Sequence, residues 1–215
     1  MKRLTAACSA LFMACLAEAQ MVDETEPPKM PLTVEGLEDM DEAAAEAIIG
    51  SVNPLENDLR GLEVAIRMHD GFLIRDDGAV FELGVTDGEG VTRLDEEFSL
   101  VETTGVDSDL LREAARQNFY IRTFKLGSAD HARMQAADLI LQEMKRTSTG
   151  NNQLKFNAGA YTCANPDIAT PDEYRFAIFV RTAPDVDFVP LSSGDIVMNK
   201  DQAGPLSFAW EPCQD

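Results

Sequence analysis

The chain has 215 residues and carries 38 acidic against 18 basic side chains, which gives a formal net charge of −20. So acidic a surface repels nucleic-acid phosphates and anionic lipid headgroups, which argues against both as partners. After the first residues no apolar stretch reaches the roughly 18 residues that a membrane-spanning helix needs, so no transmembrane segment is predicted. The charge favours solubility, and it favours cations and basic protein surfaces as binding partners.

Residues 1–19 have the three parts of a secretory signal peptide. Lys2 and Arg3 supply the positive start, residues 6–17 are apolar and uncharged, and the segment ends in Ala-Glu-Ala, with small residues at the two positions that a signal peptidase reads. We expect cleavage after Ala19 and export to the periplasm or the extracellular space. Cleavage removes two basic residues and one acidic residue, which leaves the mature chain one unit more negative.

A lipoprotein signal is the alternative for this segment. Cys15 follows Ala14 and would carry the lipid, which would tether the protein to a membrane surface. Phe12 and Met13 match the residues expected just before a lipidated cysteine poorly, which disfavours Cys15. Cys8 is disfavoured because the apolar segment before it is too short.

The two cysteines beyond the signal, Cys163 and Cys213, can pair in only one way. In an oxidising compartment a structural disulfide is the expected outcome. It would close a loop of about 50 residues, worth roughly 4 kcal/mol in the chain-entropy model. The alternative is a pair of redox-active thiols, but these usually lie close together as C-x-x-C, so the spacing favours the structural bridge.

The N-terminal part of the mature chain consists of two segments. Residues 20–36 are rich in Pro and acidic side chains and predict a flexible lead-in. Residues 37–50 have an apolar stripe at helical spacing and end at Gly50, which predicts a helix that docks either on its own domain or on a partner.

Alternating apolar residues predict three strands between Asp58 and Val101. The first runs through residues 62–68 and resumes at 72–74 after His69-Asp70-Gly71. Turns at 75–78 and 86–90 would separate the second and third strands and form an antiparallel meander.

Two helices follow, at about 108–118 with Ser108 or Asp107 as N-cap, and at 129–147 with Ser128 as N-cap. A strand at 119–126 separates them. About four further strands are predicted, with strands at 153–162, 173–182 and 206–210 and short apolar runs at 186–191 and 195–198. Runs of consecutive strands predict the α+β class, mainly antiparallel sheet with about three helices and one structural disulfide. Residues 37–215 would form a single domain, or two small lobes at 58–147 and 153–215 that share a core.

The two histidines of the chain are candidate general bases or metal ligands. His69 stands beside Asp70, but adjacent residues of a strand point to opposite faces, so a role in a turn is favoured. His131 shares a helical face with Gln135 and Asp138, without an H-E-x-x-H pattern. Motifs for a nucleophilic serine are absent, and Ser192 to Asp195 predict a turn.

Calcium is the metal ion that the charge favours. Asp76, Asp77, Asp87 and Glu89 occupy neighbouring predicted turns, but turns at opposite ends of a strand lie apart and the D-x-D-x-D-G spacing is missing. No pair of carboxylates has a spacing that singles it out for glycoside hydrolysis.

These observations predict an exported acidic protein with no assigned catalytic, cofactor-binding or metal-binding residue. The favoured function is a non-catalytic binding or envelope accessory protein whose partner is another envelope or extracellular protein, reached through residues 20–50. The alternatives are a periplasmic hydrolase that depends on carboxylates or histidine, and a calcium-binding module.

Overall fold

The computed structural model describes residues 58–87, 89–105, 107–147, 153–191, 194–202 and 209–213. The predicted signal peptide, the lead-in and the predicted helix at 37–50 lie outside these ranges, as does most of the predicted last strand at 206–210.

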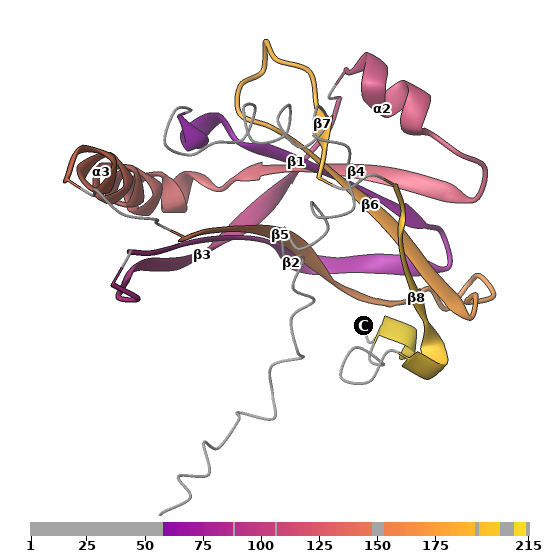
Figure 1. The fold of residues 1–215 in the computed structure, drawn as a ribbon. Coiled ribbons are helices and arrows are strands. Elements are labelled where there is room, and N and C mark those ends of the chain that lie inside the picture. The colour runs from indigo at the N-terminus through magenta and orange to yellow at the C-terminus, as the bar shows by residue number, and fades with distance from the viewer. Residues whose placement is uncertain are drawn as a thin grey trace, which may run out of the picture.

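Eight strands form the sheet within these ranges (Figure 1): β1 (Glu63–His69), β2 (Phe72–Thr86), β3 (Thr92–Thr103), β4 (Phe119–Leu126), β5 (Gln153–Ala164), β6 (Glu173–Arg181), β7 (Val189–Pro190) and β8 (Ile196–Asn199). Their order in the sheet is β5-β2-β3-β4-β1-β6-β7, and β8 also pairs with β6. Every strand pair is antiparallel. The remaining elements are the helices α2 (Asp109–Ala114) and α3 (His131–Thr147), and the 3-10 turns η2 (Leu59–Gly61), η3 (Ser128–Asp130) and η4 (Lys200–Gln202).

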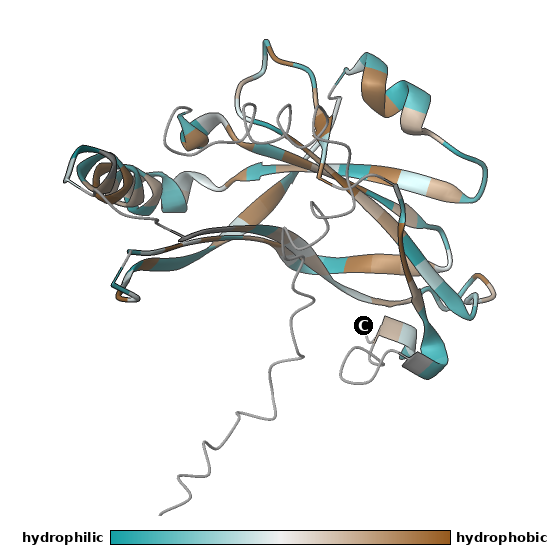
Figure 2. Cartoon of the chain, in the orientation of Figure 1, coloured by the Kyte–Doolittle hydropathy of each residue, from teal (hydrophilic) through white to brown (hydrophobic). Residues whose placement is uncertain are grey.

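The sheet curls into a half-barrel because β3 belongs to two layers. Its first part pairs with β2, and its last residues, Leu100 to Thr103, pair with β4. The layer of β2, β3 and β5 therefore faces the layer of β1, β4 and β6 (Figure 1). Alternation along each strand puts apolar side chains between the layers, and Figure 2 shows it as brown and teal bands. The largest buried rings of this core include Phe72, Phe81, Phe98 and Tyr174.

The predicted α+β class with about three helices is wrong. In the described ranges the structure is mostly antiparallel sheet with one long helix, α3, since α2 has only six residues. The third predicted helix, at 37–50, lies outside them. β2 is also longer than predicted, because it continues through the predicted turn at 75–78, and β3 ends two residues beyond Val101.

The predicted meander is wrong as well. β1 does not pair with β2; it lies between β4 and β6, and β2 lies between β3 and β5. The chain passes from one layer to the other at Asp70 and Gly71. A Cβ on Gly71 would lie 2.7 Å from Cδ of Pro171, so this crossing needs glycine. The four strands from residues 58–147 lie side by side in the sheet and strands from 153–215 flank them on both sides, so both ranges contribute to one core.

The predicted turn at 75–78 is a wide bulge inside β2. Ile74 pairs with Thr162 and Ala79 with Ala160, so four residues of β2 stand opposite Tyr161 alone. Asp77 has φ of 56°, a left-handed conformation that Asp adopts more readily than most residues. The Asp-Gly pair thus bends one strand, where sequence reasoning expected it to join two.

Two elements cover the ends of the space between the layers. At one end α3 buries Met134, Ala137, Leu141 and Met144 in the core. The predicted N-cap at Ser128 is wrong. Ser128 is the first residue of the 3-10 turn η3, whose N-cap is Gly127, and α3 begins after this turn at His131. No helix within the described ranges is long and apolar enough to cross a membrane.

At the other end lies the C-terminal segment, residues 209–213. The predicted disulfide between Cys163 and Cys213 is confirmed, with Cα atoms 5.0 Å apart. The described part of the predicted last strand is not a strand: Ala209 and Trp210 lie in a 3-10 turn, and the segment contacts β5 through one isolated bridge between Pro212 and Ala164.

Candidate functional site

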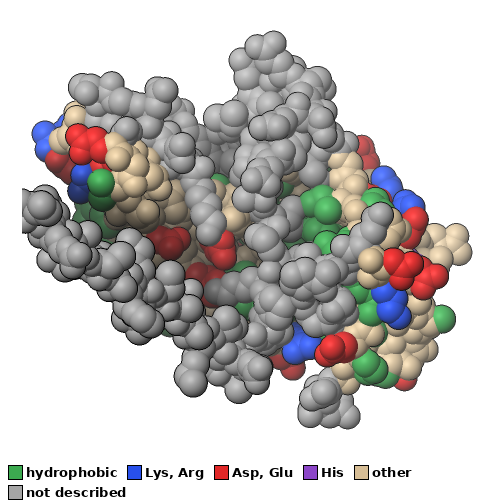
Figure 3. All heavy atoms as spheres, turned by 60° about the horizontal axis from the view of Figure 1, so that its bottom comes forward, with side chains coloured by type: hydrophobic (Ala, Val, Ile, Leu, Met, Phe, Trp, Pro, Cys, Tyr) green, Lys and Arg blue, Asp and Glu red, His purple; other side chains and the backbone are tan. Residues whose placement is uncertain are grey.

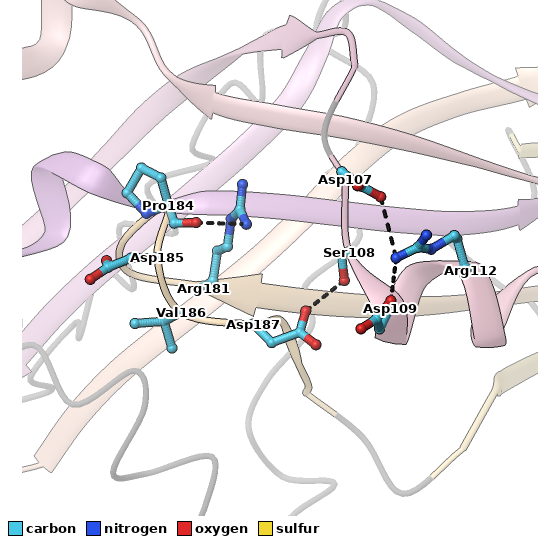
Figure 4. Close-up of a pocket in the computed structure, with 9 residues that line it drawn as sticks. All are labelled: Asp107, Ser108, Asp109, Arg112, Arg181, Pro184, Asp185, Val186 and Asp187. Carbon is cyan, nitrogen blue, oxygen red and sulfur yellow. Dashed lines mark hydrogen bonds and ion pairs between the residues drawn. The ribbon is translucent and has the colours of Figure 1, made fainter.

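A pocket of about 280 Å³ lies on the outer face of the β1–β4–β6 layer (Figure 4). It is formed where α2 meets the loop between β6 and β7. Its lining combines four aspartates, two arginines and three other residues: Asp107, Ser108, Asp109, Arg112, Arg181, Pro184, Asp185, Val186 and Asp187.

A small apolar cluster beneath the pocket holds α2 and this loop on the sheet. Ala65 of β1 and Ala177 of β6 point outward, and their small side chains leave room for Leu111 of α2 and Phe188 of the loop. Phe179 completes the cluster and is buried with them. The pocket therefore rests on packed side chains, although α2 is short.

Ser108 connects α2 to the loop. Its Oγ accepts a hydrogen bond from the Leu111 N–H as the N-cap of α2, so of the two predicted candidates Ser108 is the cap and Asp107 is not. The same hydroxyl donates to Oδ1 of Asp187 over 2.6 Å. This hydrogen bond, together with one from the Phe188 N–H, holds the pKa of Asp187 below its ordinary value.

The arginines of the pocket are neutralised by neighbouring acids. Arg181 is buried and donates to Glu63 of β1 over 2.6 Å, and its guanidinium lies 4.7 Å from the ring centroid of Phe188. Arg112 pairs with Asp109 and, at 3.5 Å, with Asp107. Each arginine thus stabilises the walls of the pocket and presents little positive charge to a ligand.

Asp185 and Val186 form the outer rim. Both are exposed, and Asp185 makes no ion pair within the described part of the chain. Figure 4 shows Asp187 turned toward Ser108 and Asp185 turned away on the far side of Val186. The rim therefore offers negative charge beside an apolar contact, an arrangement that suits a cationic group on an aliphatic stem.

The pocket is poorly equipped for nucleophilic catalysis. The Ser108 hydroxyl donates its proton to a carboxylate whose pKa is lowered, so that carboxylate is a weak base. Neither histidine lines the pocket. The geometry supports binding of a cationic group and provides no activated nucleophile.

A second charged group on the same outer face anchors the other end of α2. Arg67 of β1 is buried between the rings of Phe119 and Phe179, with its guanidinium 5.9 and 5.8 Å from their centroids. It donates to the carbonyl of Ala114 and pairs with Asp195, which also binds Arg116 at 2.8 Å. From the sequence, Arg67 falls in the predicted strand at 62–68 and Asp195 in a predicted turn. Sequence reasoning did not anticipate that the two meet, because 127 residues separate them and only the fold joins them.

The structure places the two histidines at opposite ends of the β1–β4 pair. His69 lies opposite Phe119, where β4 begins, and its Nδ1 accepts a hydrogen bond from the Gly71 N–H. His131 begins α3, after β4 has ended, and is exposed. At about 3.3 Å per residue, β4 alone separates them by more than 20 Å. They do not share a site.

The carboxylates considered for calcium are also kept apart. Asp76 and Asp77 lie in the bulge of β2, and Asp87 follows its end, about 30 Å further along an extended strand. Asp87 accepts hydrogen bonds from the N–H groups of Glu89 and Val91, and with Arg93 these hold its pKa below the ordinary value. Within the described ranges no three His, Cys, Asp or Glu side chains are arranged to hold a metal ion.

Comparison with protein-family models, with curated proteins and with solved structures found no match to this chain.

Proposed function

We propose that this is an exported, non-catalytic binding protein that recognises a basic segment of another extracytoplasmic protein at the pocket between α2 and the β6–β7 loop. The observation that carries the proposal is the rim of this pocket, where Asp185 lies beside the exposed Val186, with the hydrogen-bonded Asp187 behind them. A lysine or arginine side chain has the matching chemistry, an aliphatic stem and a cationic end.

The charge of the whole chain supports the same partner. A formal net charge of −20 attracts a basic surface over a Debye length and raises the rate of encounter. Figure 3 shows acidic side chains, in red, on another face of the molecule as well. The negative electrostatic field of the whole chain would attract the basic partner, and the pocket would fix the position of the bound segment.

Export is supported by the first 19 residues and by the disulfide, which is typical of proteins that fold in oxidising compartments. Intact-mass analysis of the exported product tests this part. We expect a chain that begins at Gln20 and in which Cys163 and Cys213 resist alkylation until a reductant is added. A product that retains Met1, or one with freely alkylated cysteines, would contradict export.

Binding is tested with two variants that change the charge equally. Asp185→Lys alters the rim of the pocket, and Asp201→Lys alters the exposed turn η4 near Lys200. The probe is a fluorescent heptapeptide with three arginines, and the same peptide with glutamates in their place is the negative probe; binding is measured by fluorescence anisotropy at low salt. We expect Asp185→Lys to weaken binding about tenfold and Asp201→Lys to weaken it about twofold or less. Equal losses in both variants would show that only the general charge acts and would overturn the proposed site.

A further inference from the structure

The single tryptophan of the chain, Trp210, lies in an aromatic seat at the end of the half-barrel opposite α3. Its ring contacts Phe72 edge-on at 5.7 Å between centroids and Tyr174 at 6.0 Å. Its indole N–H donates to the carbonyl of Pro171 over 2.9 Å. The seat thus combines apolar ring surfaces with one hydrogen-bond acceptor, which is the chemistry that recognises an indole or a similar aromatic donor.

Within the described ranges, the segment that carries Trp210 is held by the disulfide, by the burial of Ala209 and Trp210 in the core and by a small number of hydrogen bonds. Two backbone hydrogen bonds join it to β5, from Ala164 N–H to the carbonyl of Glu211 and from Cys213 N–H to the carbonyl of Ala164. Cys213 is three residues from Trp210, so the covalent bond keeps the indole next to its seat even when the hydrogen bonds open. Reduction of the disulfide removes the covalent link between the C-terminal segment and β5.

We infer that the C-terminal segment, residues 209–213, is a redox-releasable plug, and that its release opens a binding site for an apolar aromatic ligand with one hydrogen-bond donor. The inference is independent of the acidic pocket, which lies on the outer face of the sheet and shares no residue with the seat. The core between the layers keeps its other residues when the plug leaves, because α3 and the strands supply them.

The opening step requires a dithiol reductant. One of its thiolates attacks Sγ of Cys213, which is more exposed than the buried Cys163, and Cys163 leaves as a thiolate that takes up a proton. The second thiol of the reductant then displaces Cys213 as a free thiol. Two electrons pass from the reductant, which becomes a disulfide, to the cysteine pair.

The first test uses the whole mature chain and its own tryptophan. Dithiothreitol is added, and Trp210 emission, acrylamide quenching and far-UV circular dichroism are followed together. We expect a red shift and a severalfold rise in quenching, with an unchanged circular dichroism spectrum. An indole that stays buried after both thiols have become alkylatable would overturn the inference. So would loss of the sheet signal, since the disulfide would then hold the whole fold.

The second test examines the seat itself. In the oxidised Trp210→Ala variant we expect added indole to raise Tm, and 1-methylindole, which cannot donate to Pro171, to raise it less. No effect of either compound would show that the seat is not a binding site. If Trp210→Ala does not fold, the Cys163→Ser/Cys213→Ser variant tests whether the segment is released. The Trp210 emission of this variant should be red-shifted without reductant and should not change when dithiothreitol is added. Emission typical of a buried indole would refute release.

Discussion

The two faces of the β1–β4–β6 layer are held by different interactions. The inner face is apolar: Val64, Ile66 and Met68 of β1 lie in the continuous core. The outer face alternates with it along the same strand, and there Ala65 contributes to a small apolar cluster while Arg67 is buried in an ion pair. One seven-residue strand therefore takes part in both a hydrophobic core and a charged network.

The difference shows what each face does. The inner face supplies most of the burial that stabilises the fold, because burial of apolar surface is the largest favourable contribution to folding. The ion pairs of the outer face add less net stability, since removing charges from water costs free energy that their attraction offsets only in part. They hold α2 and the β6–β7 loop in one position, and the acidic pocket depends on that position.

The largest effect is expected on the inner face. Phe81 is fully buried between Phe98 and Phe156, so Phe81→Ala should lower the free energy of unfolding by about 3–5 kcal/mol through lost burial and a cavity. Urea denaturation measures it. Val101→Ala, at a residue that is 52% exposed, is the control and should change stability by less than about 0.5 kcal/mol. Similar losses in the two variants would refute the location of the core.

On the outer face, Asp195→Asn should destabilise the protein by about 3 kcal/mol, because it leaves the buried Arg67 without its counter-charge. Adding Arg67→Met should recover part of this loss, since a buried apolar side chain needs no partner. Thermal melts of both single variants and the double variant measure the coupling. Asp201→Asn, on the exposed turn η4, is the control. Additive losses at residues 67 and 195 would contradict the network.

Alkaline pH tests a polar group of the inner face. Burial raises the pKa of Tyr120 to about 12, and its hydroxyl donates to the carbonyl of Phe72. The pKa of Tyr120 in the folded protein lies above the ordinary value near 10, so folding favours the protonated hydroxyl. The stability that depends on this proton is fully present below pH 10 and is lost, by about 2–3 kcal/mol, as the pH rises toward 12. Tyr120→Phe should make stability fall less steeply over this interval in rapid urea titrations. If stability falls equally steeply with pH in wild type and Tyr120→Phe, Tyr120 is not the group that titrates.

The smallest effect is expected at the helix cap. Ser108→Ala removes the hydrogen bonds to Leu111 and Asp187 and should cost about 1–2 kcal/mol. Hydrogen exchange of α2 should become faster, while exchange in β1 stays protected. Ser108→Asn is the matched variant, because asparagine also caps helices and should restore much of the loss. Equal exchange in wild type and Ser108→Ala would exclude the capping role.

Local patterns predicted part of this fold correctly. The residue pattern located β1, β4 and β6, Ser108 was one of the two candidate caps of α2, and the two cysteines beyond the predicted signal peptide left one pairing. Each of these depends on residues close in sequence or on a count.

Other predictions failed where the outcome depended on distant partners. The Asp-Gly pair at 77–78 resembles a hairpin turn, but β5 pairs with β2 on both sides of it, so the strand continues through a bulge. The acidic pocket was missed because α2 and the β6–β7 loop are about 75 residues apart, and its aspartates are not distinctive among so many acids.

The sequence by itself determined the negative charge, the alternation of side chains along strands such as β1 and β6, and the identity of the two cysteines that pair, because these follow from composition and from the two-residue period of a strand. Only the tertiary structure decided which strands are neighbours, that β3 joins two layers, and that Arg67 meets Asp195. Strand pairing is a competition among many partners of similar local preference. It is resolved by the packing of the whole core, which no single segment contains.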